Sequence, residues 1–409
     1  MSPDANELQD LVRELHQQGT AWVPCGSGSR LDWGAPLRGD CLPVSCAGLS
    51  GIVEHNPGDF TISVRAGTPL EEVQEALAIH RQWLAVDRPW GSQRRGAGSL
   101  GGLVARGLSG GFRQRYLGIR DQLIGISLLR ADGTAARAGG RVVKNVAGYD
   151  LMRLFCGSWG SLGLITELNL RTLPQPLIRR GLLVQGSLTE LGSLSQWLLR
   201  SGLSPERLDW WSAPLAASAG LQEAPLLLIA LASISAESLE QQQAAIAGQT
   251  PLPLRPLAAV DLESLLALAR SDGAAPASGE PAADGSGESL AEPAWLLRLG
   301  ITPDRVPEAL AAPELAGLAI DLAAGSGLGL AWTLPAAGTT TGLDPARLFE
   351  LRRLCQRLGG WLIVLQQPQG SAVPAWDDAP SRPMIERVKH LFDPKLQLAP
   401  GRLPGVANP

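Results

Sequence analysis

Three glycines at every third position, Gly157, Gly160 and Gly163, are the feature that most constrains how this chain can fold. A backbone without side chains can approach a bulky polar ligand closely, and its N–H groups stay uncovered. Directly after this loop, apolar and polar residues alternate from 164 to 171, which is the period of a half-buried strand. Alone, the loop also fits an ordinary turn. Together with the strand, it predicts a ligand-binding loop anchored in a core.

Two further glycine-rich segments have the same character. The first, residues 25–30 (C-G-S-G-S-R), follows a short apolar strand, and the second covers residues 91–111. Small residues with free N–H groups, followed by a cation, suit a phosphate or pyrophosphate. Neither segment is a P-loop, and neither opens a helix with the spacing G-x-G-x-x-G. A flexible linker is the alternative for 91–111, but linkers rarely interleave Leu and Val so regularly.

Charge and metal-ligating residues exclude several classes of function. A formal net charge of −4 gives no basic field that would attract nucleic acid or anionic lipid. The five cysteines form no C-x-x-C pair and the four histidines are scattered, so we expect no metal or iron–sulfur cluster bound by this chain. Free thiols are typical of a reducing compartment, and neither a secretion signal nor a membrane-spanning segment is visible. We expect a cytoplasmic protein without a transmembrane segment.

Periodicity predicts an α+β protein. A first amphipathic helix lies around residues 8–15, hairpins are expected at 52–65 and 123–134, and Thr68 with Glu71 has the spacing of a capping box. From 295 to 366 the order strand, helix, strand, strand, helix, strand is that of a split β-α-β unit.

The length of 409 residues fits two domains, each with its own core. We expect one domain at 1–176, a second at 177–366 and a C-terminal segment at 367–409. Residues 271–293 lack a buriable pattern, which predicts a disordered insertion.

The motif V-V-K-N-V-A-G-Y-D-L-M-R-L at 142–154, followed by G-S-W-G-S-L-G-L-I-T-E, points to a family. With the other glycine segments and the tail A-P-G-R, it resembles the FAD-linked oxidases of the vanillyl-alcohol oxidase and p-cresol methylhydroxylase (PCMH) type. Within that superfamily it looks like the FAD-binding subunits of glycolate dehydrogenases (glycolate oxidases). The resemblance implies a two-subdomain PCMH-type FAD-binding domain, a ferredoxin-like α+β cap domain, and a C-terminal tail that returns to the FAD domain.

The resemblance also implies site residues. Two loops would clasp the FAD pyrophosphate, other residues would line the same cleft, and Ile165 would contact the adenine end. The cofactor-binding residues implied are Gly26, Ser27, Gly28, Ser29, Arg30, Gly98, Ser99, Leu100, Gly101, Gly102, Ser109, Gly110, Asp121, Gly163 and Ile165. Removing a hydride from a 2-hydroxy acid needs a cation for the carboxylate and a base for the hydroxyl, and the candidates are Lys144 and Arg402. For both, a structural role is the alternative: Lys144 as a contact to phosphate or a partner, Arg402 as an anchor of the tail.

Three departures from the family pattern bear on function. The loop at 26–30 has no histidine of the kind that carries covalent flavin, which implies noncovalent FAD. Trp159 stands where G-S-E-G-T-L-G members have an acidic residue, and the paired metal-binding histidines of related 2-hydroxy-acid dehydrogenases have no counterpart. These losses favour an FAD-binding subunit of a multi-subunit glycolate dehydrogenase.

In that hypothesis the partners are glycolate or a related 2-hydroxy acid, a catalytic flavoprotein subunit and an iron–sulfur subunit, through which the complex reaches a membrane peripherally. A self-sufficient FAD-dependent 2-hydroxy-acid oxidase or dehydrogenase is the second hypothesis. The third is a non-catalytic flavin-binding scaffold.

The missing histidine generates the first prediction: the purified chain releases its FAD on acid precipitation, because no side chain of the 26–30 loop can form the covalent link. Absorbance of the supernatant and the washed pellet measures this. Flavin that stays in the pellet would contradict noncovalent binding.

Overall fold

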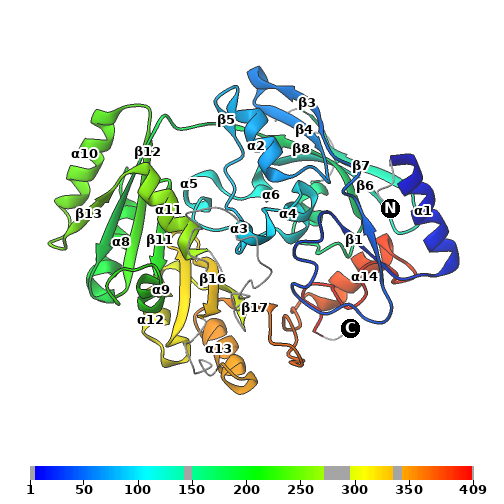
Figure 1. The fold of residues 1–409 in the computed structure, drawn as a ribbon. Coiled ribbons are helices and arrows are strands. Elements are labelled where there is room, and N and C mark those ends of the chain that lie inside the picture. The colour runs from blue at the N-terminus through cyan, green and yellow to red at the C-terminus, as the bar shows by residue number, and fades with distance from the viewer. Residues whose placement is uncertain (1–4, 142–149, 271–294, 335–342, 408–409) are drawn as a thin grey trace, which may run out of the picture.

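Two large antiparallel sheets organise the computed structural model of the chain (Figure 1), which describes residues 5–141, 150–270, 295–334 and 343–407. One sheet belongs to the N-terminal half, which consists of residues 5–174 and the returning tail 375–407. The other belongs to the cap half, residues 178–366. The α+β prediction is confirmed, whereas the boundaries at 176 and 366 stay predictions. The expected disordered insertion at 271–293 lies outside the described residues.

The sheet of the N-terminal half has five strands in the order β3-β4-β8-β6-β7. Both predicted hairpins are confirmed, since β3 pairs with β4 and β6 with β7 in antiparallel register. The bounds are β3 Ile52–Asn56, β4 Thr61–Arg65, β6 Leu123–Leu129, β7 Ala135–Gly139 and β8 Leu164–Arg171. Helices α2 (Leu70–Ala78), α4 (Leu100–Arg106) and α14 (Arg382–Phe392) contribute to the core against this sheet.

The predicted capping box at Thr68 is wrong. Helix α2 begins at Leu70 after Pro69, without a side-chain cap. The Thr68 hydroxyl instead donates to the carbonyl oxygen of Arg65 at 2.7 Å, and a carboxylate oxygen of Glu71 accepts from the amide of Ala97 at 3.2 Å. Thr68 and Glu71 therefore form hydrogen bonds with neighbouring turns and not with the first turn of helix α2.

The tail returns to the N-terminal half as predicted. Helix α1 (Ala5–Gln18) and the parallel pair β1 (Trp22–Cys25) and β2 (Leu42–Ser45) form a small core with Leu398, which bridges to Trp22. The buried ammonium of Lys389 donates to the carbonyl oxygens of Ser161 at 2.8 Å and Leu398 at 2.7 Å. It also pairs with Asp393 at 2.6 Å, so a single charge joins the tail to the glycine-rich loop.

The cap sheet has eight strands in the order β13-β10-β12-β11-β15-β16-β14-β17. This is two split β-α-β units side by side, joined where β11 pairs with β15. The sequence pattern predicts the second unit, at 296–366, but not the first, at 178–257. The strand bounds are β10 Ile178–Gln185, β11 Arg207–Trp211, β12 Leu226–Ser233, β13 Leu254–Leu257, β14 Leu296–Gly300, β15 Leu318–Ala323, β16 Leu328–Thr333 and β17 Trp361–Gln366.

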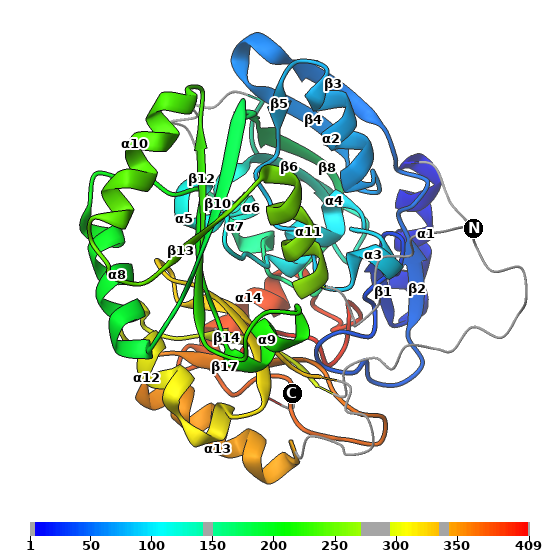
Figure 2. The same ribbon diagram turned by 60° about the vertical axis from the view of Figure 1, so that its left-hand side comes forward.

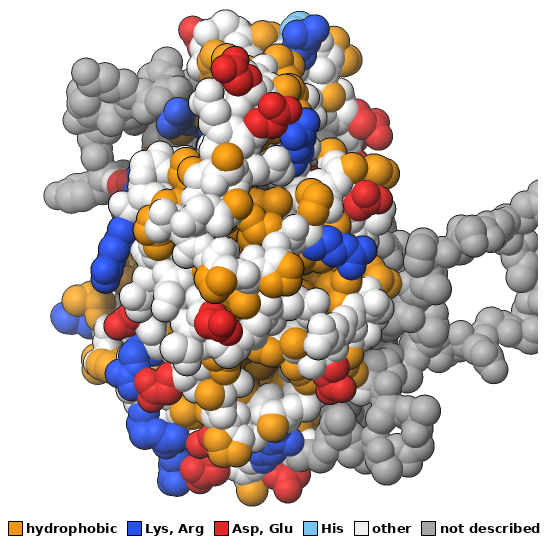
Figure 3. Space-filling model, turned by 90° about the vertical axis from the view of Figure 1, so that its left-hand side faces the viewer, with side chains coloured by type: hydrophobic (Ala, Val, Ile, Leu, Met, Phe, Trp, Pro, Cys, Tyr) orange, Lys and Arg blue, Asp and Glu red, His pale blue; other side chains and the backbone are white. Residues whose placement is uncertain are grey.

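Both faces of the cap sheet are covered. Helices α8 (Leu188–Arg200), α10 (Ala236–Ala247), α12 (Val306–Ala311) and α13 (Pro345–Arg357) pack on the outer face, as Figure 2 shows. The inner face packs on α9 (Ala213–Ser218), α11 (Ala259–Ala269) and the N-terminal half. Along β12, Leu227 and Ile229 enter the outer core, whereas Leu226 and Leu228 enter the inner one. On the face of the molecule drawn in Figure 3, apolar side chains are scattered among charged ones.

Short elements complete the described chain. They are the 3-10 turns at 57–59, 303–305 and 313–315, the strand pair β5 (Gln82–Trp83) and β9 (Leu173–Pro174), and the helices α3 (Ser92–Arg95), α5 (Arg113–Tyr116), α6 (Ile119–Gln122) and α7 (Met152–Phe155). Across the described helices, none combines the length and the apolar character needed to cross a bilayer.

A buried charge cluster joins the two halves. Arg207 on β11 pairs with Asp87 of the N-terminal half at 2.7 Å and with Asp209 at 2.9 Å. Arg270 reaches Asp87 at 3.3 Å and Asp321 at 3.4 Å. Burial raises the pKa of Asp209, and although Arg207 opposes the shift, repulsion from Asp321 adds to it. Arg207 therefore supplies the positive charge that balances the buried carboxylates of Asp87 and Asp209.

We predict that Arg207→Met lowers the free energy of unfolding by about 3–5 kcal/mol, because it leaves Asp87 and Asp209 buried without their main partner. Urea denaturation measures the loss. Arg305→Met is the matched control, since it removes an exposed arginine that pairs with Glu308 at 2.6 Å, and it should change little. Equal effects of the two substitutions would contradict the role assigned to the cluster.

Candidate cofactor-binding site

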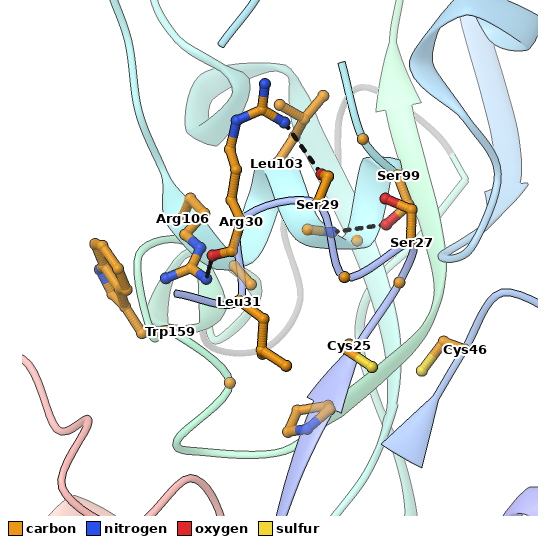
Figure 4. Close-up of a pocket in the computed structure, with 18 of the residues that line it drawn as sticks. Cys25, Ser27, Ser29, Arg30, Leu31, Cys46, Ser99, Leu103, Arg106 and Trp159 are labelled. Atoms are coloured by element: carbon orange, nitrogen blue, oxygen red, sulfur yellow. Dashed lines mark hydrogen bonds between the residues drawn. The ribbon is translucent and has the colours of Figure 1, made fainter. Parts of the chain in front are cut away.

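A cavity opens where three segments of the N-terminal half meet the tail. It encloses about 960 Å³ of space, its open mouth included. The walls come from the loop after β1, the turn and helix at 97–106, the glycine-rich stretch at 159–165, and Arg402 of the tail (Figure 4). The glycine segments predicted to bind a ligand thus lie around one cavity.

Twelve of the residues implied by the family resemblance line this cavity. They are Gly26, Ser27, Gly28, Ser29, Arg30, Gly98, Ser99, Gly101, Gly102, Gly163, Ile165 and Arg402.

Five others are not brought to the described cavity wall. Leu100 is fully buried in the core of the N-terminal half. Ser109, Gly110 and Asp121 belong to a neighbouring stretch, in which the amide of Gly110 donates to Asp87 at 2.8 Å and Asp121 accepts from the amide of Gly118 at 3.1 Å. Lys144 lies outside the described residues.

The two clasping loops touch at Gly26 and Ser99. A Cβ atom on Gly26 would lie 2.1 Å from the Ser99 hydroxyl oxygen and 2.9 Å from its Cβ, so only glycine fits there. Ser99 in turn caps α4 by accepting from the amide of Gly102 at 3.3 Å. Gly28 has a φ of 72°, a left-handed conformation that glycine adopts without strain.

The amides of the two loops are used differently. The amide of Gly101 donates to the carbonyl oxygen of Ala66 at 2.8 Å, and that of Gly102 to Ser99, so both serve the fold. By contrast, no protein acceptor among the described residues takes the amides of Ser27, Gly28 or Ser29. Consecutive open amides of this kind bind anionic oxygens. The first loop therefore offers donors, whereas the amides of Gly101 and Gly102 in the second loop stabilise the fold.

Two buried donors on the wall have no partner in the described chain: Nε of Arg30 and Nε1 of Trp33. The other nitrogens of Arg30 are engaged, since Nη2 donates to the carbonyl oxygens of Trp90 and Gly96, both at 3.0 Å. Burial and then repulsion from Arg95 lower the pKa of Arg30 to about 10, so the side chain stays charged at neutral pH. Unpaired buried donors cost free energy unless a ligand accepts from them, which fits a polar, anionic ligand.

Two further arginines line the cavity. Arg402 donates from Nε to the carbonyl oxygen of Ala35 at 2.8 Å and from Nη2 to that of Leu31, so it does anchor the tail. Arg106 donates from Nη2 to the carbonyl oxygen of Arg30 at 2.6 Å. Sequence reasoning missed Arg106, because nothing in the local pattern distinguishes it from a solvated helix-end arginine.

Trp159 contacts the guanidinium group of Arg106 with the face of its ring. Its ring centroid lies 4.2 Å from the guanidinium carbon of Arg106, a cation–π contact. Its backbone has a φ of 57°, uncommon for a bulky residue, and its amide donates to the carbonyl oxygen of Ala105 at 2.9 Å. Gly34 makes room for the indole, since a Cβ there would lie 2.4 Å from the ring.

Comparisons with known proteins agree with this geometry. Residues 3–139 match the family described as "FAD binding domain". The chain carries an FAD-binding domain. Across the described residues, no group of three or more His, Cys, Asp or Glu side chains is placed to hold a metal ion.

Relatives are matched over about half of their length or less. Glycolate oxidase subunit GlcE of Escherichia coli (strain K12) is 36% identical over 194 residues, which are 47% of this chain and 54% of that protein. D-2-hydroxyglutarate dehydrogenase of Xanthomonas citri pv. viticola is 34% identical over 171 residues, 42% of this chain and 35% of that protein. A solved alkyldihydroxyacetonephosphate synthase has a TM-score of 0.66 at 13% identity, covering 97% of this chain and 75% of that one. This last likeness shows that the two proteins share a fold over nearly the whole chain.

We predict that Gly26→Ala raises the dissociation constant for FAD by about tenfold or more, because a methyl group there forces the two clasping loops apart. Equilibrium dialysis or flavin fluorescence titration measures it. Gly58→Ala is the matched control, since a Cβ at Gly58 meets no atom within 4 Å. FAD affinity unchanged in Gly26→Ala would contradict the assignment of this contact to the site.

Proposed function

We propose that this chain is the FAD-binding subunit of a multi-subunit glycolate (2-hydroxy acid) dehydrogenase, which oxidises glycolate to glyoxylate and passes the electrons to a partner. The observation that carries the proposal is the likeness, at 36% identity, to a protein named as a glycolate oxidase subunit. Relatives named D-2-hydroxyglutarate dehydrogenase and D-lactate dehydrogenase support an oxidoreductase that acts on CH–OH groups.

The cavity residues supply binding and orientation. The open amides of Ser27, Gly28 and Ser29, together with Arg30, would hold the pyrophosphate of noncovalent FAD, and Gly26 with Ser99 would fix the distance between the loops. Gly163 and Ile165 would border another part of the cofactor. FAD, when bound, accepts the hydride from the CH–OH carbon, and the protein excludes water and sets the geometry.

The inner face of the cap sheet favours a role within a complex. It carries apolar side chains, such as Leu183, Leu228 and Trp332, and the buried cluster in which Arg207 pairs with Asp87 and Asp209. The apolar side chains cannot pair with a carboxylate or take a proton from a hydroxyl group, as oxidation of a 2-hydroxy acid requires, and the charged groups of the cluster already pair with one another. We therefore assign substrate handling to a catalytic flavoprotein subunit and electron exit to an iron–sulfur subunit.

We place the complex in the cytoplasm, in keeping with five unpaired cysteines, and propose that it reaches a membrane only through its partner subunits. A self-sufficient 2-hydroxy-acid dehydrogenase is the second candidate. It is favoured by Arg402, a cation that lines the cavity and could hold a carboxylate.

We predict that the isolated chain, loaded with FAD, reduces dye with glycolate or D-lactate about 10²- to 10⁴-fold more slowly per flavin than the co-expressed complex, the range typical for loss of one positioned base. The complex is assembled by co-expressing this chain with candidate catalytic flavoprotein and iron–sulfur subunits from the same genome. Steady-state dye reduction, normalised to flavin content, measures the ratio. Comparable turnover in both samples would refute the subunit role and favour the self-sufficient enzyme.

A complex assembled with the Gly26→Ala chain serves as the control for a scaffold. Loss of dye reduction with intact assembly, seen by gel filtration, would assign the electrons to the flavin of this chain. Full activity without flavin in this chain would show that it acts as a scaffold.

A further inference from the structure

Arg106 is a cation on the cavity wall that has no carboxylate partner among the residues the structure describes. Its two terminal nitrogens donate to the carbonyl oxygens of Arg30 at 2.6 Å and Trp33 at 3.4 Å, and its planar group lies over Trp159 (Figure 4). The negative charge of Asp32 acts to raise the pKa of Arg106, but Asp32 is itself paired with Arg95 at 3.1 Å. In the described ranges of the chain no carboxylate oxygen lies within ion-pair distance of Arg106.

The cavity carries more positive charge than a pyrophosphate needs. Arg30, Arg106 and Arg402 all line it, and their described partners are backbone carbonyl groups, hydroxyl groups or aromatic faces. The pyrophosphate of FAD has two negative charges and would also receive the open amides of the 27–29 loop. Burial, with repulsion from Arg402 and Arg30, lowers the pKa of Arg106 to about 9, so the group stays charged at neutral pH. One cation is left without an anion.

Position separates Arg106 from the clasping loops. It follows Gly101 by five residues, which is about 7.5 Å along a helix axis. Around it the wall is aromatic, since Arg106 contacts Trp33 and Trp159, both of which line the cavity. Of the two ring systems of FAD, only the isoalloxazine gains charge during turnover, and it carries acceptor atoms at N1 and O2 that a guanidinium can approach.

We propose that Arg106 faces the isoalloxazine ring of bound FAD and stabilises the negative charge that the ring gains on reduction. The hydride from the carbon of a 2-hydroxy acid brings two electrons and one proton to N5, the hydroxyl proton leaves to solvent, and the ring retains one negative charge. A fixed cation beside a ring that becomes anionic favours the reduced state. The inference rests on FAD binding and does not depend on which substrate or partner supplies the electrons.

The test compares the FAD-loaded full chain with the variants Arg106→Gln, Arg106→Met and Arg106→Lys. Sulfite adds to N5 and leaves the same negative charge on the ring, so its dissociation constant, read from bleaching of the flavin band, reports the nearby cation without catalysis. We expect the two neutral variants to bind sulfite about tenfold or more weakly, since a full charge at short range is removed. Their flavin midpoint potential, measured against a reference dye, should fall, and Arg106→Lys should stay close to the unaltered protein.

Arg298→Gln is the matched control. Arg298 is also a buried arginine that donates to a carbonyl oxygen, that of Gly107 at 3.2 Å, but it does not line the cavity. It should leave sulfite affinity and potential unchanged.

Three results would overturn the proposal. Unchanged sulfite affinity and potential in the neutral variants would mean that no charge-gaining ring lies at Arg106. Loss of flavin at an unchanged melting temperature would assign Arg106 to the pyrophosphate. Failure of both neutral variants to fold would make Arg106 a structural residue. A chain that binds no FAD even when unaltered would instead contradict the proposed function itself.

Discussion

One continuous apolar core between the cap sheet and the N-terminal half sets the geometry of the whole molecule. Six tryptophans take part in it: Trp33, Trp90, Trp159, Trp211, Trp332 and Trp376. Two of them, Trp33 and Trp159, also line the cavity, so the shape of the cavity wall depends on how the cap packs. The match to the FAD binding domain family ends at residue 139, yet Trp159 and Arg402 lie beyond it. The site is therefore completed by parts of the chain outside the recognisable domain.

In the N-terminal half, both hairpins could be predicted because a turn sequence separates their strands, at 57–59 and 131–134, and the first helix because its apolar residues form one stripe. In the cap half, the split β-α-β unit at 296–366 could be predicted from the sequence, but the unit at 178–257 could not. Its strand β12 is a run of apolar residues buried on both faces, as Leu227 and Leu228 illustrate, so it shows no period of two. Thr68 failed as a predicted cap for a different reason, since its hydroxyl found the nearer carbonyl oxygen of Arg65.

For the site, the sequence indicated which loops gather but not how each is used. A glycine-rich sequence fits a loop with open backbone amides and a closely packed loop equally well. Only the structure separates Gly28, whose amide has no described protein acceptor, from Gly101, whose amide is bonded to Ala66 and whose Cβ would lie 2.8 Å from the Cβ of Ala66. Gly110 lies beyond the described cavity wall, and its amide donates to Asp87, which Arg207 ties to the cap. Contacts between residues that are distant in the sequence leave no local sequence pattern.

The exchange of an acidic residue for tryptophan at position 159 explains why Arg106 keeps its charge available. In the family resemblance, members with the sequence G-S-E-G-T-L-G have a carboxylate at this point, and a carboxylate that close would pair with the guanidinium and cancel its field. The indole instead holds the guanidinium at 4.2 Å by a cation–π contact, worth about 0.5–2 kcal/mol, without neutralising it. The left-handed backbone of Trp159 and the glycine opposite its ring, Gly34, show that the fold accommodates this side chain at some cost. A cation that is positioned but not paired is what an anionic ligand requires.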